Sequence, residues 1–337
     1  MIMLKFDEEK YVKLGKETVD HRKEIEKIAD EISADGYDNI FFISSGGSLA
    51  IMFQYEKIIK RISKKPVFSE VAGEIVLTGN ELLNERSLVI TASKSGDTKE
   101  TVRAMEYCKE RNIRIVSFVG IMDSKLAELS DYVIHDHSPE VEHSYINLHY
   151  FIFRLLNKAN SFPEYEQFAE EMELLPELLV DVKKQFDPVA QKIAKNHHKD
   201  DYQIWVGGGL TWGDVYLFSM CVLEEMQWMR TKSVTSAEFF HGTLEIVDEE
   251  VPVFLVKGED ETRPLDERVE KFMNDYTEKG VVIDTKDFPL NGISPKFRKY
   301  MSSLIIECIL TERLAVQYEH RTGHDLSFRR YYRQFDY

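Results

Sequence analysis

The chain has 337 residues, with 43 basic and 59 acidic side chains and a formal net charge of −16. Its length can hold two ordinary domains, and its 43% hydrophobic fraction is that of a globular rather than a disordered chain. The negative charge repels nucleic acid and anionic membrane surfaces, so we expect neither as a main partner.

In chain order, short apolar strands alternate with helices over the first half. Strands are predicted at 39–47, 86–93, 114–120 and 131–136, and helices at 8–35, 48–62, 98–112 and 144–159. Nearly continuous apolar strands between helices are typical of a parallel sheet that is covered on both faces. The sequence therefore predicts an α/β fold.

The second half repeats this pattern. Segment 202–209 (YQIWVGGG) corresponds to 39–47, 251–262 (VPVFLVKGEDET) to the strand and loop at 87–98, and 280–288 to 114–120. Matching order and spacing predict two copies of one α/β unit in tandem. The expected divisions are an N-terminal helix (1–35), a first domain (36–160), a helical connector (161–200), a second domain (201–320) and a C-terminal tail (321–337).

The sequence predicts no targeting segment and no cysteine-based site. The N-terminus MIMLKFDEEK becomes charged too early for a signal peptide, and no stretch reaches the ~18–20 uninterrupted apolar residues of a membrane helix. Cys108, Cys221 and Cys308 are too widely spaced for a disulfide framework or a zinc site. We expect a soluble cytoplasmic protein without a metal.

Two hydroxyl-rich loops mark the first half. One lies in ITASKSGDTKETV (90–102) and the other in SSGGSLA (44–50), and each follows a predicted strand. Ligands of a parallel sheet bind beyond the carboxyl ends of strands, where the first turn of a helix attracts anions. The candidate phosphate-binding residues are Ser45, Gly47, Ser48, Ser93, Lys94, Ser95 and Thr98. The alternative is helix capping, because Asp97 and Glu100 have the spacing of a capping box.

These loops carry a family resemblance. ITASKSGDTKET resembles the S-x-S-G-x-T-x-E-T signature of sugar isomerase (SIS) domains, and SSGGSLA is similar to the loop that opens them. The resemblance covers about residues 35–337 and implies two SIS-type α/β sandwich domains, as in the isomerase half of glucosamine-6-phosphate synthase. It implies that Ser48, Ser93, Ser95 and Thr98 hold a sugar 6-phosphate, with Lys94 contributing mainly through its backbone. The second copy has carboxylates in LVKGEDETRP, so it should bind no second phosphate.

The second half offers two acid–base candidates. In the apolar segment GDVYLFSMCVLEEMQWMRTK (213–232), neighbouring Glu224 and Glu225 would lie about 100° apart on a helix, so one of them is expected to be buried. Burial would raise the pKa of that carboxyl towards the range of an acid–base catalyst. His241 could shuttle protons. A structural ion pair to Arg230 or Lys232, and a merely packed histidine, are the alternatives.

The resemblance favours catalysis. Isomerase domains of the synthase place a catalytic glutamate sixteen residues before a histidine, which selects Glu225 and His241. The sequence EEMQW…SAEFFHG resembles that of the fructosamine (fructoselysine) 6-phosphate deglycases. It implies that His241 helps to open the ring, that Glu225 moves a proton between C1 and C2, and that water releases the amine, with no metal or redox cofactor. The implied partners are a phosphorylated sugar-amine and a second subunit of a homodimer or larger homo-oligomer.

The C-terminal tail departs from the synthase. It has Arg333 near the position of a ring-opening lysine, and arginine cannot act as a base. Arg333 would bind a substrate carboxylate or phosphate, or the tail would dock on an acidic surface. Glu238 and His324 are weaker candidates for the walls of the site.

Two other functions stay open. One is an aldose–ketose isomerase or a glucosamine-6-phosphate deaminase on the same scaffold. The other is a non-catalytic phosphosugar sensor, against which the Glu225 and His241 pair counts.

Overall fold

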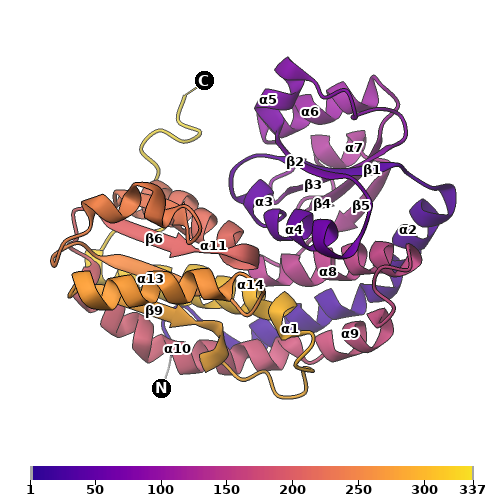
Figure 1. Cartoon of the computed structure of the whole chain (residues 1–337). Coiled ribbons are helices and arrows are strands. Elements are labelled where there is room, and N and C mark those ends of the chain that lie inside the picture. Colours follow the sequence, from indigo (N-terminus) through magenta and orange to yellow (C-terminus); the bar gives the residue numbers. More distant parts are fainter. Residues whose placement is uncertain (1–2, 336–337) are drawn as a thin grey trace. The chain divides into compact units, whose positions relative to one another are not determined.

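The computed structural model describes residues 3–335 and divides the chain into two compact units (Figure 1). The N-terminal unit is Val12–Leu174. The C-terminal unit comprises Leu175–Tyr337 together with the stretch up to Tyr11. The outermost residues of the predicted segments 1–35 and 321–337 lie outside the described part.

The N-terminal unit contains a five-stranded sheet in the order β2-β1-β3-β4-β5, and every neighbouring pair is parallel. The strands are β1 (Asn39–Ser44), β2 (Val67–Val71), β3 (Ser87–Ser93), β4 (Arg114–Val119) and β5 (Tyr132–His135). The helices after α1 (Glu8–Asp20) are α2 (Arg22–Asp35), α3 (Gly46–Ala50), α4 (Phe53–Ile62), α5 (Ala72–Thr78), α6 (Lys99–Lys109), α7 (Lys125–Leu129), α8 (Val141–Lys158) and α9 (Tyr165–Met172).

Burial explains the apolar runs of this sheet. Strands β1 and β3 are buried at every position, and β4 at every position but its first. One face packs against α5, α6 and α7 through a continuous apolar cluster that includes Phe41, Val89 and Met105. Helix α8 is buried over most of its length, in agreement with its apolar sequence. The sheet is thus a rigid base for the loops at its edge.

The C-terminal unit contains a four-stranded parallel sheet in the order β7-β6-β8-β9. Its strands are β6 (Gln203–Gly207), β7 (Thr231–Thr235), β8 (Val253–Lys257) and β9 (Gly280–Asp284). Its helices are α10 (Leu175–His197), α11 (Trp212–Leu217), a π-helix (Phe218–Glu224), α12 (Glu225–Gln227), α13 (Arg263–Tyr276), α14 (Arg298–Ile309), a second π-helix (Leu310–Leu314) and α15 (Ala315–Thr322). Short 3₁₀ turns lie at Gly209–Thr211, Phe239–His241, Thr243–Ile246 and Thr285–Asp287.

The predicted duplication is confirmed by the strand order. Strands β6, β8 and β9 take the places of β1, β3 and β4, and β7 lies beside β6 as β2 lies beside β1. Neither β2 nor β7 was predicted. No helix within residues 3–335 is long and apolar enough to span a lipid bilayer.

The single helix predicted over 8–35 is wrong, because α1 ends at Asp20 and α2 begins at Arg22. At the break, the backbone N–H of His21 donates to the oxygen of Thr18, three residues back, instead of continuing the α-helical pattern.

Asp266 is a buried carboxyl group in α13 and accepts a hydrogen bond from the hydroxyl of Ser236. Desolvation, with a smaller contribution from the charge of Asp260, raises the pKa of Asp266 to about 6. The folded state therefore binds this proton more tightly than the unfolded chain does. The stability that results is complete below about pH 4 and is lost as the pH rises through about 6.

We predict that Asp266→Asn removes this pH dependence. The wild-type free energy of unfolding, relative to that of the variant, should fall by about 2 kcal/mol between pH 4.5 and 7. Denaturant titrations of both proteins at the two pH values measure the difference. A constant difference would contradict the assignment.

Candidate functional site

The two hydroxyl-rich loops lie at the same edge of the N-terminal sheet. Strands β1 and β3 are parallel neighbours, with Phe42 paired to Ile90, so the segments that follow them leave from one edge. The hydroxyl of Ser44 donates to the carbonyl oxygen of Ala92 at 2.9 Å and ties the two strand ends together. The segments that hold Ser45–Ser48 and Ser93–Thr98 are thereby held at neighbouring positions.

The loop after β3 has a fixed backbone. The N–H of Gly96 donates to the buried hydroxyl of Ser93 at 3.0 Å, and its carbonyl accepts from the N–H of Leu126. Gly96 has φ +67°, and a Cβ there would lie 2.2 Å from Oγ and 2.5 Å from Cβ of Ser124. Only glycine fits this turn without strain.

The side chain of Lys94 points to Asp136. Its ammonium group donates to the Asp136 carboxylate and to the carbonyl oxygen of Ser138, each at 2.6 Å. The buried Asp136 also accepts hydrogen bonds from Ser144 and Asn147. The lysine charge is therefore already neutralised, and what Lys94 can offer an anion at the loop is its backbone.

Helix α6 begins at this loop, where a capping box at Asp97 and Glu100 was the alternative interpretation. Its N-cap is Thr98 rather than Asp97, and the Thr98 side chain makes no capping hydrogen bond. Within the described residues, the hydroxyls of Ser45, Ser48 and Thr98 have no hydrogen-bond partner, and all three residues are partly exposed. Neutral hydroxyl donors thus lie beside the start of α6, and the first turn of a helix attracts anions.

The matching edge of the C-terminal sheet holds an anion of its own. The carboxylate of Asp260, which follows β8, accepts from the backbone N–H of Leu210 at 2.6 Å and from that of Thr262 at 2.8 Å. It also accepts from the Thr262 hydroxyl. The backbone N–H groups of Leu210 and Thr262 are therefore occupied by a carboxylate of the protein itself.

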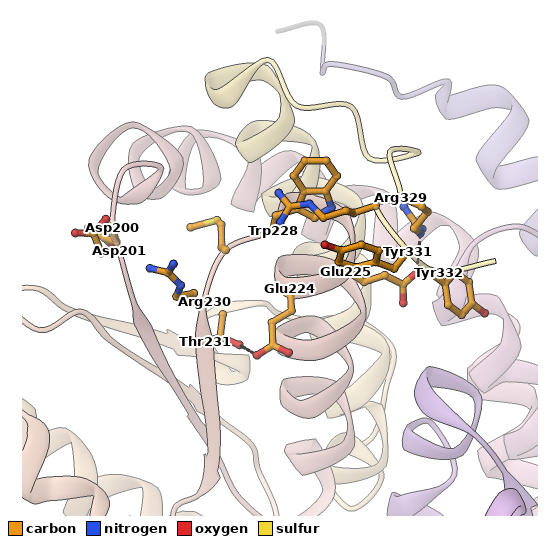
Figure 2. A pocket seen from close by; sticks show the side chains of 12 residues that line it. Asp200, Asp201, Glu224, Glu225, Trp228, Arg230, Thr231, Arg329, Tyr331 and Tyr332 are labelled. Atoms are coloured by element: carbon orange, nitrogen blue, oxygen red, sulfur yellow. Dashed lines mark hydrogen bonds and ion pairs between the residues drawn. The ribbon is translucent and has the colours of Figure 1, made fainter. Parts of the chain in front are cut away.

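The C-terminal unit contains a separate cavity of about 810 Å³ (Figure 2). Its wall is formed by residues from the turn before β6, the end of α12, the start of β7 and the tail. These are Asp200, Asp201, Glu224, Glu225, Trp228, Met229, Arg230, Thr231, Arg329, Arg330, Tyr331 and Tyr332.

Both glutamates of the predicted pair line this cavity. Glu224 accepts a hydrogen bond from the hydroxyl of Thr231 at 2.6 Å, and Glu225 forms an ion pair with Arg329 at 2.8 Å. The expected burial of one of them is wrong, because Glu224 is exposed and the side chain of Glu225 is 28% exposed. Both residues lie where the helix ends and line the cavity, which leaves both carboxylates accessible to solvent.

The tail is docked on the end of α12. Buried Gln227 donates to the carbonyl oxygen of His324 at 2.7 Å and accepts from the hydroxyl of Thr322 at 2.9 Å. The ring of His324 packs on Trp228, with ring centroids 4.3 Å apart. These contacts place Arg329 beside Glu225, and Figure 2 shows the ion pair between the Arg329 guanidinium and the Glu225 carboxylate.

The other predicted residues lie elsewhere. His241 and Glu238 are exposed and do not line the cavity. Glu225 precedes β7 and His241 follows it, so the two lie towards opposite ends of a strand that spans about 13 Å. Arg333 stacks on Tyr332 and is also outside the cavity wall.

Arg329 was missed from the sequence. The tail's arginine and tyrosine density was the available signal, but only the docking of His324 on α12 decides which arginine reaches Glu225.

Comparison with known proteins identifies the family. Residues 36–154 match the SIS domain. Fructosamine deglycase FrlB of Bacillus subtilis is 30% identical over 330 residues, which cover 96% of this chain and all of that protein. This chain belongs to the SIS-domain family.

One further relative and one solved structure are similar to this chain over nearly all of its length. Fructoselysine 6-phosphate deglycase of Escherichia coli is 22% identical and covers 91% of this chain and 89% of its own. A Bacillus subtilis structure solved under the name of a phosphosugar isomerase has a TM-score of 0.89 at 30% identity and covers 94% of this chain and 97% of its own. The tandem SIS fold is thereby confirmed, and the protein is an enzyme of the deglycase and isomerase type.

We predict that Gly96→Ala destabilises the N-terminal unit more than Gly46→Ala does. Both glycines have positive φ, but a Cβ on Gly46 meets nothing within 4 Å, whereas one on Gly96 collides with Ser124. The strained backbone costs about 1 kcal/mol in either variant, and the collision should add about 1–3 kcal/mol. Urea unfolding of the two variants measures the difference, and equal losses would contradict this packing of the loop.

Proposed function

We propose that this protein is a deglycase that cleaves fructosamine 6-phosphates into glucose 6-phosphate and a free amine or amino acid. The observation that carries the proposal is Glu225, a carboxylate in the wall of a cavity of about 810 Å³, held by an arginine at 2.8 Å. Full-length similarity to a protein named fructosamine deglycase supports this reaction over others of the family.

In the proposed reaction, the N-terminal loops hold the 6-phosphate. Ser45, Ser48 and Thr98 supply hydroxyls that have no partner among residues 3–335, and the backbone of the Ser93–Thr98 loop supplies N–H groups. Neutral donors suit this role because they need no counter-charge of their own. Holding the phosphate converts binding into orientation of the carbon chain.

Glu225 is the proposed acid–base group. It removes a proton from C1 of the open-chain ketosamine and returns a proton to C2, while the C2 oxygen gains a proton and the nitrogen loses one, which leaves an imine at C1 and a hydroxyl at C2. Water adds across the C=N bond, and the amine departs as the C1 aldehyde of glucose 6-phosphate forms. The ion pair with Arg329 fixes the direction of the carboxylate, so Arg329 is a positioning residue in this scheme.

His241 is the proposed group for ring opening, and we propose that it acts at the Glu225 of a partner subunit. The positions of Glu225 before β7 and of His241 after it support this arrangement, because the length of the strand lies between the two residues in the chain. A homodimer supplies the missing group.

We predict that Glu225→Gln lowers kcat for glucose 6-phosphate release by about 10²–10⁴-fold, because the amide cannot exchange a proton. Glu224→Gln is the matched control, since Glu224 lines the same cavity and bonds only to Thr231 in the described part of the chain. It should retain turnover within a few-fold. Enzymatic detection of glucose 6-phosphate released from a panel of fructosamine 6-phosphates measures both.

Two controls define the substrate. Unphosphorylated fructosamines should react poorly, and glucosamine 6-phosphate should yield no hexose phosphate. Release from glucosamine 6-phosphate alone would replace the proposal with a deaminase, and equal activity of both glutamine variants would remove Glu225 from the mechanism.

A further inference from the structure

The cavity of the C-terminal unit holds two guanidinium groups that the proposed reaction does not use. Arg230 lies just before β7, and Arg330 lies next to Arg329 in the tail. Within residues 3–335, neither guanidinium forms an ion pair with a carboxylate, and the guanidinium of Arg330 instead lies 4.2 Å from the ring centre of Trp228. In Figure 2, Arg230 and Trp228 line the same cavity as Glu225.

A shortage of carboxylates does not explain why Arg230 and Arg330 form no ion pair within the described residues. The chain has 59 acidic residues against 43 basic ones, and Asp201 and Glu224 belong to the wall of this cavity. Elsewhere in the C-terminal unit, Arg263 pairs with Asp284 and Arg298 with Glu259, whereas the exposed Arg268 and Arg321 form no ion pair within the described residues. Arg230 and Arg330 thus keep free the planar donors that bind a carboxylate through two hydrogen bonds.

Trp228 adds a second observation. It has φ +57° and ψ +26°, the left-handed conformation that a bulky residue seldom adopts, and the residue is 40% exposed. Such a conformation costs about 1–2 kcal/mol. The strain places the indole in the cavity wall, between His324 and Arg330, where it offers an apolar face beside a cation.

We propose that this cavity binds the amino-acid part of the substrate, with Arg330 and Arg230 binding its carboxylate and Trp228 packing on its hydrocarbon chain. The inference rests on the proposed function for the sugar half. It narrows the substrates to fructosamine 6-phosphates made from amino acids and excludes those of simple amines as good substrates. A volume of about 810 Å³ accommodates a long side chain such as that of lysine.

A matched substrate pair tests this assignment. The 6-phosphofructosyl derivatives of lysine and of cadaverine differ only in the carboxylate. The wild-type kcat/KM should favour the lysine compound by at least about tenfold, and Arg330→Gln and Arg230→Gln should each reduce this preference by about tenfold, as expected for a lost charge-assisted hydrogen bond. Arg321→Gln, an exposed substitution on α15 outside the cavity wall, should keep the wild-type preference.

Calorimetric titration of the same two compounds measures binding without any need for turnover. If neither compound releases glucose 6-phosphate, the proposed function fails, and the ratio of the two dissociation constants still tests the carboxylate. Equal affinities in wild type overturn the inference. So does an equal loss for both compounds in the arginine variants, since the guanidiniums would then bind the shared phosphosugar.

Discussion

Parallel pairing of the strands is the constraint on which this structure depends. In a parallel sheet, all carboxyl ends open at one edge, so the segments after β1 and β3 must lie together, as must those after β6 and β8. Free N–H groups of the helices that follow make this edge attractive to anions. The function proposed here uses that edge in the N-terminal unit.

The two copies of the α/β unit differ in what the hydrogen-bond donors at this edge of the sheet bind. In the C-terminal unit, the carboxylate of Asp260 occupies the backbone donors of Leu210 and Thr262. In the N-terminal unit, the loop is held by Ser93 and by the Lys94–Asp136 ion pair, and within the described residues the hydroxyls of Ser48 and Thr98 remain without a protein partner. An internal anion in one copy and open donors in the other fit a duplicated unit in which one copy kept ligand binding and the other took up a different role.

The sequence predicts the fold and the loops well because both are local patterns. Apolar runs and loop spacing reveal β1, β3, β6 and β8, whereas edge strands such as β7 (TKSVT) are too short and polar to be recognised. The burial expected for Glu224 or Glu225 failed because both residues line a cavity that the sequence pattern does not reveal, and Arg329 was missed because only tertiary docking of the tail selects it. The roles of Glu225, His241 and the serine loops stay predictions.

The most direct test is a crystal structure of the protein with glucose 6-phosphate. We expect the phosphate at the loops Ser45–Ser48 and Ser93–Thr98, bound by hydroxyls and backbone N–H groups, with the Lys94 ammonium group still on Asp136. The Asp260 loop should hold no ligand. Phosphate density at the Asp260 loop, or empty N-terminal loops at saturating ligand, would contradict the account.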